Sequence, residues 1–123
     1  MFYSQGDIIL IPFPFSDQTN GKPRPAVIIS NSLVNGTNDV ICAALTTTLW
    51  NDNFSFPINK DSLNKPLKDN REGEIRCHKL FLADKKIIQA KISSLKAGKY
   101  AELYKKIHPL ISPENQSKVS INA

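Results

Sequence analysis

The side chains best suited to handling a phosphate group lie at three separate places in the sequence. Arg24 lies between two prolines, and its planar guanidinium can hold two phosphate oxygens, although a solvated arginine at a strand end would look the same. Thr46 begins a run of three threonines whose hydroxyls can hydrogen-bond a phosphate oxygen or simply favour a β-strand. Arg76-Cys77-His78 adds a second guanidinium and an imidazole. The usual pKa of an imidazole, ~6.5, suits proton transfer, but a surface histidine at a strand end fits as well.

Two further residues have an aromatic or imidazole ring with more than one plausible use. Trp50, the only tryptophan, follows the threonine run and could stack on a base or pack at a dimer contact. His108, before Pro109, suits the negative end of a helix dipole better than an active site.

The common signatures of enzymes and metal sites are absent from the sequence. It contains no glycine-rich phosphate loop, G-x-S-x-G elbow, HExxH motif or paired carboxylates. Cys42 and Cys77 are isolated, so they have neither the spacing of a zinc site nor the number needed for a disulfide framework, and we expect reduced thiols. We therefore expect no metal and no cofactor, and composition and spacing alone name no function.

The basic residues are concentrated in the second half of the chain. Residues 1–59 hold two Lys/Arg against four Asp, whereas residues 60–123 hold fourteen Lys/Arg against seven Asp/Glu, within an overall net charge of +5. A basic half favours a polyanionic partner such as nucleic acid, but it is also compatible with an ordinary solvated surface.

Short strands are expected to position these residues. The run Ile8–Ile11 predicts a strand buried on both faces, and the turn-forming residues 14–23, which include Asn20-Gly21, predict a loop. Apolar runs and alternating patterns predict further strands at 25–30, 40–45, 54–58 and 88–92. Apolar residues at helical spacing, from Tyr100 to Ile107, predict one amphipathic helix that stops at Pro109.

The predicted elements describe one small, mainly β domain. Several strands and one C-terminal helix, without βαβ alternation, favour a small barrel or sandwich with a helix packed on it. The length of 123 residues suits a single domain, which we place at 1–111, followed by a polar tail at 112–123. The longest apolar run is far too short to span a membrane and the first residues lack a secretory pattern, so we expect a cytoplasmic protein.

Three blocks, in order, resemble the MazF/PemK family of toxins. GDIILIPFPFSDQTNGKPRPAVIIS, from Gly6 to Ser30, resembles the opening strand, polar loop, Arg-Pro and second strand of the family. CAALTTTL, from Cys42 to Leu49, resembles the third strand, which ends in a threonine. IRCHKLFLADKKIIQAKISSL, from Ile75 to Leu95, resembles the last two strands. The resemblance covers roughly residues 5–108 and implies an SH3-like β-barrel of the MazF/PemK/CcdB type, usually dimeric.

The resemblance also implies a reaction and the residues that perform it. Members of the family cleave single-stranded RNA without a metal, by attack of a ribose 2′-hydroxyl that leaves a 2′,3′-cyclic phosphate and a 5′-hydroxyl. That reaction needs a base, an acid and fixed positive charge. By position in the family pattern, the residues expected to be catalytic are Arg24, Thr46, Arg76 and His78. One branch of the family has an aspartate at the position of His78, and that aspartate is the base. His78 can therefore be the base only if its imidazole accepts the proton in place of that carboxylate. The residues expected to bind RNA are Lys22, Trp50 and Lys79.

The expected partners are single-stranded RNA, a second copy of the chain, and an antitoxin with an acidic disordered segment that lies over the groove around Arg24 and Arg76. Two other functions stay open. One is a non-catalytic toxin on the same barrel, similar to the CcdB-type gyrase poisons, although those depend on an aromatic C-terminus and this chain ends Ser120-Ile121-Asn122-Ala123. The other is a family member that binds RNA or antitoxin without cleaving.

Overall fold

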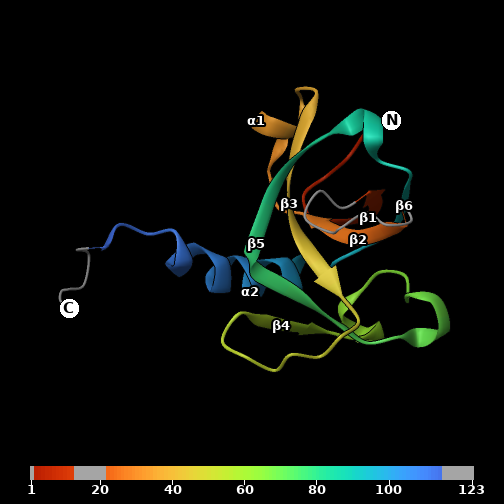
Figure 1. Cartoon of the computed structure of the whole chain (residues 1–123), viewed down its shortest axis with the longest axis vertical. Helices are drawn as coiled ribbons and strands as arrows, with labels where there is room; N and C mark the ends of the chain where they lie inside the picture. The colour runs from red at the N-terminus through yellow and green to blue at the C-terminus, as the bar shows by residue number, and fades with distance from the viewer. Residues whose placement is uncertain (1, 13–21, 115–123) are drawn as a thin grey trace.

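The computed structural model describes residues 2–12 and 22–114, which form one curled antiparallel sheet with a C-terminal helix (Figure 1). The sheet has the strand order β4-β5-β3-β2-β1-β6. Its strands are β1 (Asp7–Pro12), β2 (Pro23–Ile28), β3 (Asp39–Thr46), β4 (Ser55–Ile58), β5 (Gly73–Asp84) and β6 (Ala90–Ser94). The sheet is curled into a half-barrel, which confirms the predicted mainly β fold.

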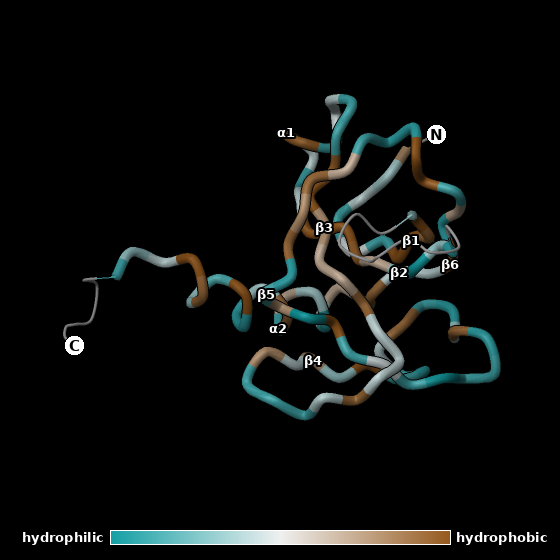
Figure 2. Tube along the Cα trace, in the orientation of Figure 1, coloured by the Kyte–Doolittle hydropathy of each residue, from teal (hydrophilic) through white to brown (hydrophobic). Residues whose placement is uncertain are grey.

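Both faces of the sheet are packed, because alternate residues of its strands enter two separate apolar clusters. On β1, Ile8 packs in one cluster with Val27 and Ala43, whereas Ile9 and Ile11 pack in the other. All three isoleucines are fully buried, as predicted for a strand with two covered faces. The hydropathy colouring shows apolar residues along the central strands and mostly polar residues in the long connection from β4 to β5 (Figure 2).

The C-terminal helix packs on one of these clusters. Helix α2 (Ala97–Ile107) buries Leu103 and Ile107 in the cluster that contains Ile8. The Tyr100 hydroxyl donates a hydrogen bond of 2.6 Å to the carbonyl oxygen of Ile29, which ties the helix to the end of β2. As predicted, the helix stops before Pro109, and the chain continues as the single turn η4 (His108–Leu110).

Several elements differ from the sequence prediction. No helix was predicted between the strands at 25–30 and 40–45, but this connection contains the one-turn helix α1 (Ser32–Asn35), in which the Asn31 side chain accepts a hydrogen bond from the backbone N–H of Leu33. The strand predicted at 88–92 lies at Ala90–Ser94, and the long strand β5 was not predicted from an apolar pattern. Strand β2 was expected at 25–30, but it begins at Pro23 and ends at Ile28. Most of the loop predicted at 14–23 lies outside the described residues, as does most of the tail at 112–123.

The remaining elements close the ends of the sheet. The connection from β4 to β5 contains two short turns, η1 (Lys60–Ser62) and η2 (Lys68–Asn70), and η3 (Lys85–Ile87) joins β5 to β6. Outer strand β4 carries an exposed proline, Pro57, opposite Glu74 of β5. The outer edge of β6 is met by the backbone N–H of Asn64, which donates to the carbonyl oxygen of Ser94 at 2.9 Å.

Candidate functional site

Five of the seven residues selected from the sequence line one cavity of about 210 Å³. The cavity lies where β2 begins, β3 ends and β5 bends away from β4. It is lined by the selected residues Arg24, Thr46, Trp50, Arg76 and Lys79, together with Ala44, Leu45 and Thr48. The sequence prediction therefore found most of the lining, although no contact between these residues could be read from the chain.

Pairing between β2 and β3 brings Arg24 to Thr46. Ala26 of β2 lies opposite Ala44 of β3. Two residues further along both strands, the same register places Arg24 opposite Thr46, and the alternation of side chains puts both on one face. The backbone of Thr46 also packs closely against Gly73 of β5. A Cβ added to Gly73 would lie only 2.7 Å from the Thr46 carbonyl oxygen, so a larger residue at 73 would displace Thr46.

A register shift in β5 decides which of its polar residues face the cavity. Ile75 of β5 lies opposite Leu45 and Leu80 lies opposite Ala43, so five steps along β5 match only two along β3. Simple alternation would put His78 on the same face as Arg76. Between these two pairs β5 has more residues than β3, so the alternation of side chains is interrupted. Lys79 therefore lines the cavity with Arg76, and His78 lies outside the cavity lining.

The two terminal nitrogens of the Arg76 guanidinium are bound to neighbours within the protein. Its side chain is 7% exposed, and its two terminal nitrogens form a bidentate ion pair with Asp52, with distances of 3.0 Å to Oδ1 and 2.8 Å to Oδ2. Nη1 also donates to the hydroxyl of Ser55 at 2.9 Å and lies 3.4 Å from Oε1 of Glu74. One cation is therefore shared by two carboxylates, and Arg76 contributes no unpaired positive charge to the cavity.

Glu74 is the buried centre of this network. Its carboxylate accepts hydrogen bonds from the Ser55 hydroxyl at 2.7 Å and from the backbone N–H groups of Trp50 and Asn51 at 3.1 and 3.0 Å. These bonds fix the loop that carries Trp50, whose ring centroid lies 5.4 Å from the Arg76 guanidinium carbon. The indole is more than half exposed, so one of its faces is open for stacking.

The network holds both carboxylates in the ionised form. The hydrogen bond from Arg76, which is larger than the opposing effect of desolvation, keeps the pKa of Asp52 far below its usual value. Burial opposes ionisation of Glu74, but hydrogen bonds from Ser55, Asn51 and Trp50, together with the charge of Arg76, outweigh it and lower the pKa. Neither group is suited to accept a proton near neutral pH, because a depressed pKa makes a weak base.

Two of the selected residues lie away from the cavity lining. His78 is exposed and stacks on Phe54, with ring centroids 4.1 Å apart. Partial burial lowers the pKa of His78 from its usual value, and the positive charges of Arg76 and Lys79 lower it further, which favours the neutral ring. Lys22 is exposed just before β2 and is not among the residues that line the cavity.

Arg24 and Lys79 are the cations that the site leaves unpaired. Within residues 2–12 and 22–114, neither of them forms an ion pair. Thr46 accepts a hydrogen bond of 3.0 Å from the backbone N–H of Thr48, so its own hydroxyl proton remains available for donation. The cavity can therefore offer two cationic groups and one hydroxyl donor to an anion.

Sequence reasoning missed Asp52, Ser55 and Glu74. For Glu74 a signal existed, because residues two apart in a strand share a face, and Glu74 therefore lies beside Arg76. For Asp52 and Ser55 there was none, since their contact with Arg76 crosses from the loop and β4 to β5. No group of three or more metal-ligating side chains occurs in the described part of the chain, and no helix there is long and apolar enough to cross a membrane.

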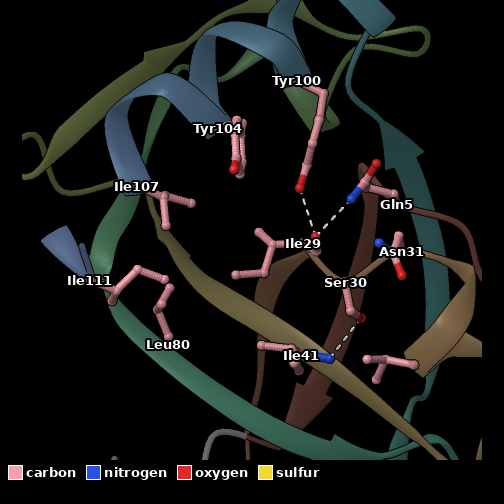
Figure 3. Close-up of a pocket in the computed structure, with 11 residues that line it drawn as sticks. Gln5, Ile29, Ser30, Asn31, Ile41, Leu80, Tyr100, Tyr104, Ile107 and Ile111 are labelled. Atoms are coloured by element: carbon pink, nitrogen blue, oxygen red, sulfur yellow. Dashed lines mark hydrogen bonds between the residues drawn. The ribbon is translucent and has the colours of Figure 1, made fainter. Parts of the chain in front are cut away.

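A second concavity, of about 340 Å³, lies on the other side of β3 and β5 and is mainly apolar (Figure 3). Its lining includes Leu80 of β5 together with Tyr104, Ile107 and Ile111 from α2 and the segment after it. The Tyr100 hydroxyl and the Gln5 amide both donate to the Ile29 carbonyl oxygen at its rim. Tyr104 and Ile111 are largely exposed, so an apolar surface extends beyond the concavity.

One comparison with known proteins identifies a family. The profile described as PemK-like, MazF-like toxin of type II toxin-antitoxin system matches residues 4–111. A search of curated protein sequences found no significant match.

Similar solved structures include MazF from Deinococcus radiodurans, with a TM-score of 0.70 and 18% identity over 90% of this chain and 97% of that one. An endoribonuclease from Mycobacterial species has a TM-score of 0.69 and 15% identity over 89% and 90% of the two chains. An endoribonuclease in complex with its cognate antitoxin, also from Mycobacterial species, has a TM-score of 0.66 and 17% identity over 90% and 99%. At these identities the likeness establishes the fold.

Proposed function

Because the chain belongs to the family of PemK-like, MazF-like toxins of type II toxin–antitoxin systems, we propose that it is a metal-independent endoribonuclease acting on single-stranded RNA in the cytoplasm. The observation that carries the proposal is the single cavity shared by Arg24, Thr46 and Lys79 beneath the exposed face of Trp50. Two cationic groups and a hydroxyl suit a phosphate, and an indole suits a base next to it. Solved structures with the same fold carry the name endoribonuclease.

In the proposed reaction the ribose 2′-oxygen forms a bond to the adjacent phosphorus, and the bond from phosphorus to the 5′-oxygen breaks. The 2′-hydroxyl proton passes to a base and the 5′-oxygen receives a proton, which gives a 2′,3′-cyclic phosphate and a 5′-hydroxyl. Negative charge grows on the non-bridging oxygens in the transition state. Arg24 and Lys79 would meet this charge, and Thr46 would donate a hydrogen bond to it. Arg76, which is bound by Asp52 and Glu74, would keep Trp50 and the cavity wall in place.

The direct test is incubation of the protein with a long RNA in EDTA, followed by mapping of the cut ends. We expect cleavage, 5′-hydroxyl ends that a polynucleotide kinase can label without prior phosphatase treatment, and resistance of DNA of the same sequence, which lacks the internal nucleophile. Loss of all cutting in EDTA with recovery in Mg²⁺ would contradict the proposal. Retained RNA binding without cutting under both conditions would assign a binding role alone.

His78 is proposed to accept the proton from the rim, through a water molecule, because its ring lies outside the cavity lining. We expect a rate that rises with pH through an apparent pKa below 6.5, since burial and the neighbouring cations lower the pKa of His78. His78→Ala should remove this inflection and cost about tenfold, less than the ~10²–10⁴ typical of a directly placed base. His108→Ala, at the end of α2, is the matched control. An unchanged rate and pH profile in His78→Ala would make it a surface residue.

An antitoxin segment of acidic and disordered character is proposed to cover the cavity around Arg24 and Lys79. Because these contacts lie at the surface, salt should screen them over a Debye length of ~8 Å at physiological ionic strength. We expect the dissociation constant, measured by calorimetry, to rise at least tenfold between about 0.05 and 0.5 M NaCl. A constant that does not change with salt would mean that the contact is chiefly apolar and lies elsewhere.

A homodimer is proposed to form through the second, apolar surface around Tyr104, Ile107 and Ile111. The large exposed apolar side chains there are the kind of surface that a second protein chain covers. Sedimentation should show a dimer for the wild type and a monomer for Tyr104→Glu. A monomeric wild type at micromolar concentration would contradict this assignment.

A further inference from the structure

Arg76 is bound on two sides by carboxylates that differ in their access to water. The Glu74 side chain is 2% exposed, whereas the Asp52 side chain is 40% exposed. Glu74 also has three other hydrogen-bond donors, so it is fixed in the protein. Apart from Arg76, Asp52 accepts a bond within its own loop from Phe54 N–H, because the one hydroxyl proton of Ser55 is donated over the shorter distance to Glu74. Asp52 is therefore the partner of Arg76 that can leave.

The Asp52 carboxylate binds Arg76 in the geometry that a phosphate would use. Both of its oxygens meet the two terminal nitrogens of the guanidinium, at 3.0 and 2.8 Å, and two phosphate oxygens form the same pair of parallel bonds. The Arg76 side chain lines the same cavity as Arg24 and Lys79. An anion held by those two cations would thus lie next to the place that Asp52 occupies.

Arg76 also carries a donor for which the described residues provide no acceptor. Its Nε is buried and without a hydrogen-bond partner in this part of the structure, while the whole residue is 6% exposed. A buried donor that lacks a partner is costly, so the protein does not fully satisfy the Arg76 side chain.

We propose that Asp52 occupies the position of an RNA phosphate in the free protein, and that the phosphate displaces it from Arg76 when RNA binds. The inference rests on the proposed RNA substrate. Ser55 and Glu74 keep the guanidinium in place during the exchange. Asp52 regains water when it is released, because its side chain is 40% exposed, and the incoming phosphate takes over its two bonds to Arg76, so the buried guanidinium keeps an anionic partner. Asp52 is therefore a positioning residue that competes with the substrate, and Trp50, two residues earlier in the same loop, reports its departure.

Asp52→Asn tests the exchange, with inorganic phosphate as the probe and the emission of Trp50, the only tryptophan, as the signal. Removal of the competing carboxylate should tighten phosphate binding about three- to tenfold, the opposite of what loss of a supporting residue does. Asp39→Asn is the matched control, because it removes the same charge at the other end of β3, about 23 Å from Thr46 at the usual rise per residue. The control should change the affinity less than twofold. Equal or weaker phosphate binding by Asp52→Asn would overturn the proposal.

A second measurement uses the unaltered protein and separates exchange from a general loss of negative charge. Addition of phosphate should shift the ¹⁵N and ¹H resonances of Arg76 Nε, because the anion bound to the terminal nitrogens of the same guanidinium changes. Resonances that stay in place while Trp50 emission responds would overturn the proposal. Neither measurement requires cleavage, so a protein that shows both shifts and does not cut RNA contradicts the proposed function alone. A protein that cuts RNA and shows neither shift contradicts the exchange alone.

Discussion

Arg24→Ala is expected to lower the rate of RNA cleavage about a hundredfold or more without changing the shape of its pH profile. Arg24 is one of two cations in the cavity without an ion-pair partner among the described residues, and a fixed charge aimed at the phosphate acts most strongly in the transition state. A guanidinium stays protonated at every working pH, so its removal alters the height of the profile and leaves the inflections where they are.

Arg24→Lys should recover only part of the rate, because an ammonium group cannot form two parallel bonds to phosphate oxygens. Lys86→Ala, which removes an exposed cation from η3, is the control for the general loss of positive charge and should stay within twofold. The measurement is the single-turnover rate with a short labelled RNA between about pH 5 and 9. A rate for Arg24→Ala within threefold of the wild type would remove Arg24 from the catalytic group.

Glu74→Ala is expected to lower the free energy of unfolding by about 3–5 kcal/mol, because it leaves the buried Arg76 with one partner fewer and the N–H groups of Trp50 and Asn51 without acceptors. Glu74→Gln keeps the size and one acceptor oxygen, so its loss should be smaller, about 1–3 kcal/mol. Glu102→Ala, which breaks the exposed pair with Lys99, should cost less than about 1 kcal/mol. Urea denaturation measures all three. A cost below about 1 kcal/mol for Glu74→Ala would mean that the network does not support the fold.

The same network gives the stability a dependence on pH. The pKa values of Asp52 and Glu74 are lowered in the folded protein from their usual values of 3.8 and 4.5. A group with a depressed pKa stabilises the fold above its unfolded-state value, and this stabilisation is lost as the pH falls through the folded-state value. The wild type should therefore lose stability below about pH 4.5, and the gap to Glu74→Gln should narrow there. A gap that widens in acid would contradict this assignment.

The sequence predicted those elements whose pattern lies within one segment. The isoleucines of β1 and the helical spacing from Tyr100 to Ile107 each show a buried face without reference to any other part of the chain. Helix α1 was missed because it is a single turn that depends on one capping side chain, Asn31, and a pattern four residues long has no period.

The candidate site was predictable in its residue types and not in its contacts. The family pattern selected Arg24 and Thr46, and the pairing of β2 with β3 brings them together. It also selected Arg76 and His78 as catalytic residues. The register shift in β5, which depends on how β3 pairs with it, turns Lys79 toward the cavity in place of His78. No pattern within β5 alone encodes such a shift, because the pairing with β3 determines which residue of β5 has no partner in the ladder.

The outer strands of the half-barrel leave few backbone groups to which another strand could attach. Pro57 removes a donor from the four-residue strand β4, and the segment at Asn64 and Lys65 bonds to Ser94 and Ser93 of β6. Because both outer strands, β4 and β6, offer few free backbone groups, the sheet resists edge-to-edge aggregation even when the chain accumulates without a partner. A neutralising peptide that contacts β4 or β6 must consequently be recognised by its side chains. Its sequence, more than its capacity to form a β-strand, will decide whether it binds.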